Sequence, residues 1–304
     1  MKSLLKYFLA LLFLVLSFDS SDAAVNLHFK EECGIGQPFF AVISSDAPIF
    51  NPSVKWMGKV IPLDVLKFGN SYRAYALLGG AVNRIKAGVY PLEFSVVTKK
   101  GGKPVYKSVN IKLTTREYPE TKLTVEPKMV NPPKSELKRI ENESKLTANA
   151  RAAMTTKKLW QTRALPPLSN IVVTSAYGER RTFNGVQKSI HSGVDLRAPI
   201  GTPVSSIYPG KVILTGDHYY AGKSVYIDSG NGVVAAYFHL NSINVKKGST
   251  VNAGDVIGKA GKTGRVTGSH LHLSVFLSGQ SIDPMGLLDV EFPQSIKSLK
   301  QISF

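Results

Sequence analysis

Cysteine is almost absent from this chain of 304 residues, in which Cys33 is the only one. A single cysteine excludes an intramolecular disulfide, and without further thiols it excludes a metal site built from thiolates. We therefore expect Cys33 to be a free thiol, either buried or partly exposed.

Long apolar runs are absent after the N-terminus, so no later segment is expected to cross a membrane. The one apolar stretch, residues 7–18, is too short to span a bilayer comfortably. It follows a basic start and precedes the small-residue site Ser21-Asp22-Ala23, the composition of a secretory signal peptide over residues 1–23. An uncleaved anchor is the alternative. We expect a periplasmic or extracellular protein with no stable membrane insertion after signal cleavage.

Acidic residues are scarce, with 21 Asp and Glu against 38 Lys and Arg, which gives a net charge of +17. An excess of this size favours polyanionic surroundings. Nucleic acid is one such partner, but the predicted export argues against it, and anionic polymers of the cell envelope fit better. The alternative is that the positive charge only keeps the protein in solution.

Histidine is also scarce, but four of the six histidines lie in short motifs from residue 191 onward. The segment His270-Leu271-His272 lies in an apolar run typical of a strand. Because alternate side chains of a strand project to the same face, both histidines can reach one metal ion and a substrate held on it. The other motif is His191-x-x-x-Asp195. When either motif occurs without the other, its residues often have a structural role and bind no metal. Their joint occurrence favours a metal site.

These motifs offer the donors of a hydrolytic zinc site. Catalytic zinc sites usually take three ligands from His, Asp, Glu or Cys and leave a fourth position to water or substrate. His191, Asp195 and His272 would supply such a set for one Zn2+ ion. His239 and His270 are candidates for acid and base catalysis, because neutral imidazole accepts a proton and imidazolium donates one. The two histidines outside these motifs are expected to have no catalytic role: His28 and His218.

A longer series of segments surrounds these motifs in a fixed order between residues 169 and 290. The segments are 175–181, 191–204, 210–212, 225–232, 237–240, 258–264, 267–272 and 283–284. Together they resemble the lysostaphin-type zinc endopeptidases, which cut the peptide part of bacterial peptidoglycan. The resemblance implies that His191, Asp195 and His272 bind zinc and that His239 and His270 are the catalytic histidines. It also implies that the stem peptides of peptidoglycan are the substrate.

The chain departs from that family at one place. Many members follow the His-x-His motif with Phe-Glu, whereas this chain has Leu273-Ser274. The acidic residue is not a zinc ligand. We therefore expect altered support around the ligands and no loss of the metal.

The expected fold is mainly β, in two domains. Short strand-like runs separated by Gly, Pro, Asn and Asp predict an immunoglobulin-like β-sandwich over residues 24–118, without a disulfide. Residues 119–168 form a linker with extended stretches and a charged helix at 135–146, which could pack on either domain. A β-rich lysostaphin-type peptidase domain follows over 169–290, and 291–304 is a C-terminal tail. The sandwich could position the enzyme, gate its groove or inhibit it, or bind a partner.

Three residues ahead of the first metal motif are further candidates for the substrate groove, although a structural role is at least as well founded: Tyr177, Arg180 and Asn184. The function expected from the sequence is that of a secreted zinc endopeptidase that hydrolyses peptide cross-links of peptidoglycan during cell-wall remodelling. Two alternatives are kept. One is a catalytically inactive wall-binding activator of another hydrolase, and the other is a zinc endopeptidase that acts on proteins or on glycine-rich bridges.

Overall fold

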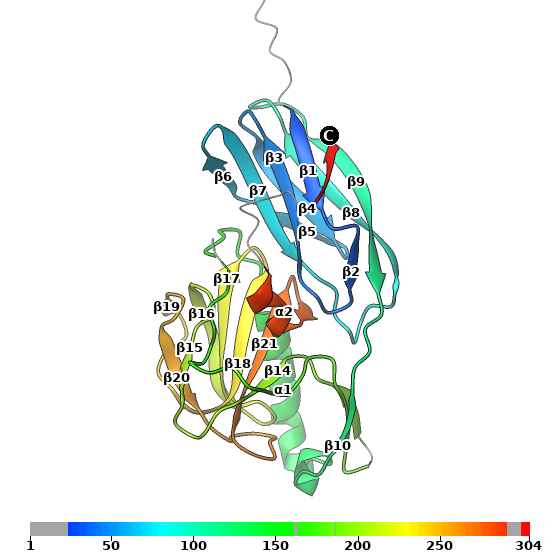
Figure 1. The fold of residues 1–304 in the computed structure, drawn as a ribbon. Coiled ribbons are helices and arrows are strands. Elements are labelled where there is room, and N and C mark those ends of the chain that lie inside the picture. The colour runs from blue at the N-terminus through cyan, green and yellow to red at the C-terminus, as the bar shows by residue number, and fades with distance from the viewer. Residues whose placement is uncertain (1–23, 161–162, 186, 291–298) are drawn as a thin grey trace, which may run out of the picture.

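The computed structural model describes residues 24–160, 163–185, 187–290 and 299–304. Within these residues the chain forms two β-rich halves and a connector that carries one long helix (Figure 1). This agrees with the predicted mainly β fold. The predicted signal peptide, residues 1–23, lies outside the described residues.

The N-terminal half consists of two five-stranded sheets that pack face to face (Figure 1). Its strands are β1 (Val25–Phe29), β2 (Glu32–Gly34), β3 (Phe39–Ser45), β4 (Phe50–Trp56), β5 (Lys59–Pro62), β6 (Val65–Phe68), β7 (Ser71–Leu78), β8 (Gly88–Val97), β9 (Val105–Thr114) and β23 (Lys300–Ser303). One sheet has the order β23-β1-β3-β7-β6 and the other the order β2-β9-β8-β4-β5. In β9, Val109, Ile111 and Leu113 are buried between exposed neighbours, as expected when one face of a strand turns to the core. The two sheets form the predicted sandwich, whereas its immunoglobulin-like topology stays a prediction.

The last strand of this half comes from the opposite end of the chain. β23 pairs antiparallel with β1, and Leu27 lies opposite Ile302. Residues 299–304, which the sequence sets apart as a tail, therefore complete the N-terminal sheet. Cys33 is buried in the same half as a free thiol, where burial raises its pKa.

The two halves share an apolar interface. β3 is buried along its whole length, because the inner face of its sheet joins the sandwich core and the outer face packs against the second half. Phe40 and Val42 belong to the outer face. Trp160 from the connector packs against Phe40 and against Tyr208, with ring centroids 6.2 Å apart in both pairs. The sandwich is therefore anchored on the second half by apolar packing.

The connector follows the second half closely. It contains β10 (Glu120–Leu123), the short 3-10 helix η1 (Pro127–Met129) and α1 (Lys134–Arg151). Arg139 donates to the carbonyl of Asp217, and Glu143 accepts from the amide of Tyr219. Ala150, at the end of α1, packs with buried side chains of the large sheet. The charged helix therefore packs on the C-terminal half, and no described helix is both long and apolar enough to cross a membrane.

The C-terminal half is built on a ten-stranded sheet and ends in a short helix, α2 (Pro284–Asp289). The strands of the sheet are β11 (Val173–Ser175), β14 (Val194–Arg197), β15 (Pro203–Ser205), β16 (Gly210–His218), β17 (Gly222–Gly230), β18 (Val233–Ile243), β19 (Thr250–Val251), β20 (Val256–Ala260), β21 (His270–Leu277) and β22 (Gln280–Ile282). Its main order is β11-β14-β21-β18-β17-β16-β19. Beside it, β10 pairs in parallel with β12 (Arg180–Phe183), which pairs antiparallel with β13 (Gln187–Ile190). The pairing of β14, β21 and β18 determines where the histidines of the motifs meet.

Candidate metal centre

Neighbouring strands bring the predicted ligands together. β14 runs antiparallel to β21, and Asp195 lies directly opposite His272. His191 enters from the turn that precedes β14, four residues before Asp195. On the other side of β21, Phe238 of β18 lies opposite His272 and stacks on its ring, with centroids 5.0 Å apart and planes 3° from parallel. Strand register and stacking thus fix His272 between its neighbours.

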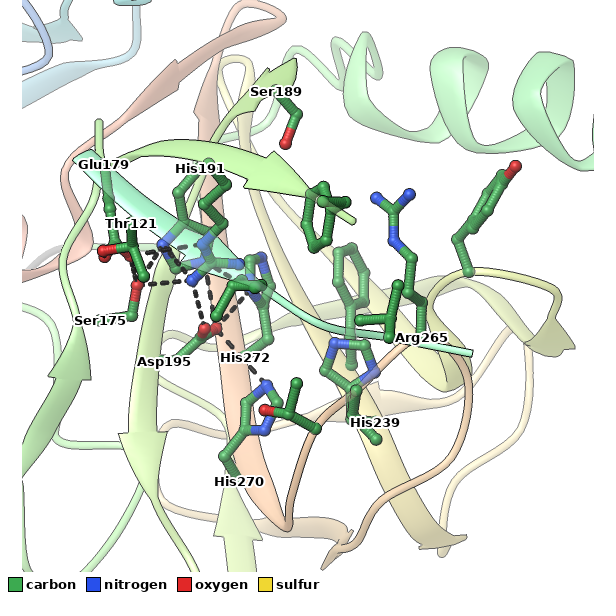
Figure 2. A pocket seen from close by; sticks show the side chains of 18 of the residues that line it. Thr121, Ser175, Glu179, Ser189, His191, Asp195, His239, Arg265, His270 and His272 are labelled. Atoms are coloured by element: carbon green, nitrogen blue, oxygen red, sulfur yellow. Dashed lines mark hydrogen bonds and ion pairs between the residues drawn. The ribbon is translucent and has the colours of Figure 1, made fainter. Parts of the chain in front are cut away.

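The donor atoms of these residues converge on one point (Figure 2). Nε2 of His191 lies 3.1 Å from Oδ1 of Asp195 and 3.0 Å from Nδ1 of His272. The same Nδ1 lies 2.8 Å from Oδ1 of Asp195. Ligand atoms bound at about 2.0–2.2 Å to a common tetrahedral zinc ion lie roughly 3.3–3.6 Å from one another, a few tenths of an ångström wider than these distances. The spacing therefore fits a single ion held by all three residues.

The tautomers of the two imidazoles also fit a cation. Nδ1 of His191 lies 2.8 Å from the carbonyl oxygen of Ala176, which can only accept, so Nδ1 carries the hydrogen and Nε2 keeps its lone pair. Nε2 of His272 lies 2.7 Å from Oγ of Ser274, whose own hydrogen is donated to the carbonyl of Ser192. Nδ1 of His272 therefore keeps its lone pair as well. Two nitrogen lone pairs and a carboxylate oxygen that face each other form a donor set suited to a cation.

Ser274 stands where many family members have an acidic residue, and it supplies the hydrogen-bond acceptor for His272. The space around this pair is tight. A Cβ at Gly193 would lie 2.6 Å from Nε2 of His272 and 2.6 Å from Oγ of Ser274. Glycine at 193 therefore allows the His272–Ser274 pair to form.

Two further histidines stand beside the convergent donors. Nδ1 of His239 donates to the carbonyl of Thr263 at 2.8 Å, and Nδ1 of His270 donates to the carbonyl of Gly268 at 2.9 Å. In the neutral tautomer that these bonds favour, the lone pair lies on Nε2 of each ring, and Nε2 of His270 lies 3.6 Å from Oδ1 of Asp195. The two rings are 4.8 Å apart between centroids. Both can exchange protons with a group bound between them.

Burial lowers the pKa of two of the site's imidazoles, His239 and His272. It lowers the pKa of His239 to about 3, with a further contribution from His270 and His272, and it lowers the pKa of His272 to about 4. His239 also has a backbone φ of +61°, a left-handed conformation that a non-glycine residue adopts at a cost. Such strain often marks a functional position, because the surrounding structure must hold it.

Arg181, which was not among the predicted site residues, contacts the second oxygen of Asp195. One terminal nitrogen of Arg181 donates to Oδ2 of Asp195 at 2.6 Å, which leaves Oδ1 to the convergent donors. Nε of Arg181 donates to Glu179 at 3.3 Å, and Glu179 also accepts from Ser175 and from Thr121 of the connector. Arg181 thus orients Asp195, and the connector is tied into the same network.

The three candidates for the substrate groove lie elsewhere. Tyr177 is 2% exposed, and its hydroxyl accepts from the amide of Val82 and donates to the carbonyl of Ser281, so it joins the two halves. Arg180 is exposed, and its amide donates to the carbonyl of Pro119. Asn184 pairs through its side-chain amide with both backbone groups of Val125. Tyr177 and Asn184 thus hold the sandwich and the connector through their side chains, whereas the contact of Arg180 is made by its backbone. None of the three lines the pocket around the convergent donors.

All five motif residues line one pocket of about 420 Å³. Its walls also come from the connector, from β12 and the residue before it, from β18, and from the loops before β17 and β21. They include Thr121, Glu179, Arg181, Phe183, Tyr220, Phe238 and Arg265. No described residue of the sandwich over 24–118 belongs to that lining. The pocket therefore opens beside the connector.

Comparisons with known proteins agree with this geometry. Residues 189–284 match peptidase family M23. The chain is 43% identical over 115 residues to the peptidoglycan DD-endopeptidase ShyA of Vibrio cholerae serotype O1, which covers 37% of this chain and 26% of ShyA. It is 39% identical over 110 residues to lysostaphin of Staphylococcus staphylolyticus, which covers 34% of this chain and 23% of lysostaphin. The chain thus spans about a quarter of the length of these curated relatives.

A solved structure extends the likeness over both halves. The crystal structure of a candidate M23 peptidase from Pseudomonas aeruginosa matches with a TM-score of 0.60 and 27% identity. The match covers 82% of this chain and 93% of that chain. The family match spans all five motif residues, and together these likenesses show that the C-terminal half contains a peptidase M23 domain.

Proposed function

We propose that this protein is a zinc-dependent endopeptidase that hydrolyses peptide cross-links of bacterial peptidoglycan. The observation that carries the proposal is the convergence of His191, Asp195 and His272 on one point, with donor atoms 2.8 to 3.1 Å apart. The name of ShyA, a peptidoglycan DD-endopeptidase, supports the substrate class. A role in cell-wall remodelling is part of the same proposal, because cleaving cross-links loosens the peptidoglycan network.

The three convergent side chains would hold the metal. A zinc ion bound there supplies Lewis acidity, which polarises a carbonyl oxygen and makes water acidic enough to attack at neutral pH. Arg181 holds the second oxygen of Asp195, so the carboxylate presents Oδ1 in a fixed direction. Ala176 and Ser274 hold the outer nitrogens of the two ligand histidines in the same way.

His239 and His270 would move the protons. His239 is neutral because of its burial, and its Nδ1 hydrogen is fixed on Thr263, so Nε2 can accept a proton from the attacking water. Nε2 of His270 is held within the site by the bond from Nδ1 to Gly268. Once protonated, an imidazole in this place stabilises the developing oxyanion or gives its proton to the leaving amine. We assign the catalytic roles to these two residues.

We further propose that the protein acts outside the cytoplasm, in the periplasm or at the cell surface. The proposal rests on the composition of residues 1–23, and the net charge of +17 supports contact with anionic envelope polymers. The inactive activator is less well supported than an enzyme. Such a protein needs no assembled site, whereas here the ligands and both proton carriers lie in one pocket.

Digestion of purified sacculi tests the proposal. With one equivalent of zinc, the mature chain is expected to convert cross-linked muropeptides into monomeric ones, which mass spectrometry identifies. A chelator should stop the release, and added zinc should restore it. Asp195→Asn is the matched control, since it keeps the side-chain shape but removes the charge of the ligand.

The alternatives give distinct outcomes in the same experiment. If zinc-loaded protein leaves sacculi intact but increases cleavage by a second hydrolase, the activator is correct. If it cleaves added proteins or glycine-rich bridges and leaves ordinary cross-links untouched, the substrate class is wrong.

A further inference from the structure

Arg265 occupies a part of the pocket that the proposed mechanism does not use. It lies in the loop that precedes β21, and its backbone amide donates to the carbonyl of Tyr220 at 2.9 Å. Figure 2 shows its side chain above His239, on the other side of the pocket from Thr121 and Glu179. It therefore stands beside a proton carrier and away from the network of Arg181.

Two aromatic rings hold the guanidinium group. Its central carbon lies 4.6 Å from the ring centroid of Phe183 and 4.6 Å from that of Tyr220. One terminal nitrogen lies 3.5 Å from the carbonyl oxygen of Met129 in the connector. Rings cover the faces of a guanidinium, whereas its N–H donors point outward in its plane. The packing fixes that plane at the wall of the pocket.

The charge of the pocket favours an anionic ligand at this place. The described residues of its lining include two carboxylates, Glu179 and Asp195, and both contact Arg181. The acidic groups are thus held at the end of the pocket opposite Arg265. With a divalent cation bound by His191, Asp195 and His272, the positive charges of the pocket would outnumber the negative ones. A site of this sign attracts negatively charged substrate groups.

We propose that Arg265 binds a free carboxylate of the peptide substrate close to the scissile amide. A planar guanidinium can bind a carboxylate through two parallel hydrogen bonds, which gives orientation as well as affinity. Arg265 is thus a specificity-determining residue: the enzyme prefers peptides that carry a carboxylate near the bond that is cut. This inference rests on the proposed function and names a chemical feature of its substrate.

Two matched substrates test it. The cross-linked peptide that the protein cleaves in sacculi is synthesised in two forms, which differ only in having a carboxylate or a carboxamide nearest the scissile bond. The wild-type protein is expected to cleave the carboxylate form with a kcat/KM about 10- to 100-fold higher, the range of one charge-assisted pair. Arg265→Gln should remove most of this preference, and Arg265→Lys should keep part of it.

Controls separate recognition from folding. Arg180→Gln removes an exposed arginine outside the pocket and should keep the full preference. Zinc content and melting temperature of Arg265→Gln and Arg265→Lys show whether the fold survives. Calorimetry with the His270→Ala variant measures the affinity for each peptide without turnover. This variant should bind the carboxylate form more tightly than the carboxamide form.

Two results overturn the inference and leave the proposed function standing. One is an equal kcat/KM of the wild-type protein for the two forms. The other is an undiminished preference in Arg265→Gln. If instead the wild-type protein cleaves neither sacculi nor either peptide, the proposed function fails and the inference fails with it.

Discussion

Two of the described histidines, one in each half, are buried and lie with Nε2 against a serine hydroxyl, yet their surroundings differ. In the N-terminal sandwich, Nε2 of His28 lies 2.7 Å from Oγ of Ser44, and in the C-terminal half Nε2 of His272 lies 2.7 Å from Oγ of Ser274. The two histidines are 2% and 7% exposed. Nδ1 of His272 faces Asp195 and His191, whereas Nδ1 of His28 is buried without a hydrogen-bond partner among the described residues. Burial and a serine partner therefore fix a ring but do not make a metal site.

Strand register explains the difference. Across from His28, the neighbouring strand β3 places Val42, an apolar residue. Across from His272, the neighbouring strand β14 places Asp195, and the turn before it adds His191. A metal site arises where the pairing of strands sets donors opposite one another. His28, by contrast, faces Val42 and Gln301 across its two strand pairings, so neither partner is a histidine or a carboxylate.

The largest effect is expected from one substitution made in both pairs. His272→Gln should reduce bound zinc from one ion per chain to almost none, because a neutral amide replaces a nitrogen ligand. Cleavage of sacculi should fall on the order of 1,000-fold or more, since the metal contributes several kcal/mol to the transition state. Metal analysis and muropeptide release measure the two effects. His28→Gln should keep zinc and activity, and equal zinc loss in the two variants would contradict the contrast between the pairs.

A second prediction separates ligands from proton carriers within the site. His239→Ala and His270→Ala should each lower kcat by about 100- to 10,000-fold, the usual contribution of a general acid or base. Both should keep most of the zinc, because neither side chain belongs to the convergent donor set. Single-turnover kinetics and metal analysis of the same samples test this. Full activity of His239→Ala would remove its assigned role, and loss of zinc from His270→Ala would make it a ligand.

A smaller effect is expected from the serine partners. Ser274→Ala removes the acceptor that holds the ring of His272, and loss of such a partner typically weakens metal binding by about 10- to 100-fold. Ser44→Ala removes the equivalent partner of His28 and should leave zinc affinity unchanged. Competition with a zinc-binding dye gives both affinities. Unchanged zinc affinity in Ser274→Ala would mean that Phe238 stacking alone orients the ring.

The motif residues could be predicted because their information is local. His270 and His272 are two residues apart on one strand, and His191 and Asp195 are four apart across a turn. Residues this close in sequence stay close in space even where the predicted fold is wrong in other parts. That the two motifs, about eighty residues apart in the chain, form one site was inferred from their joint occurrence and from the resemblance to a known family. The structure brings all four residues and His239 into one pocket.

Other parts of the site depend on register and long-range pairing, which the sequence does not reveal. Arg180 and Arg181 are adjacent on β12, and a shift of one residue decides which of them points inward. From the sequence, Arg180 is a candidate for the groove beside an equally founded structural role, whereas it is Arg181 that contacts Asp195. Likewise, β10 pairs with β12 across about sixty residues, and β23 pairs with β1 across the whole chain. Neither segment carries a local signal for its partner.

The smallest effect concerns stability and the sandwich pair itself. Burial lowers the pKa of His28 below its ordinary value of 6.5, with a smaller contribution from Arg73. Below that pH the unfolded chain binds a proton more readily than the folded one, so the contribution of His28 to stability is complete above 6.5 and is lost as the pH falls. Between pH 7.5 and 5.5, with zinc in excess, the melting temperature of the wild-type protein should therefore drop by a few degrees more than that of His28→Gln. If the melting temperatures of the two proteins fell in parallel with pH, His28 would have the same pKa in the folded and unfolded states. The His28–Ser44 pair would then differ from the His272–Ser274 pair only in the residues that lie opposite it.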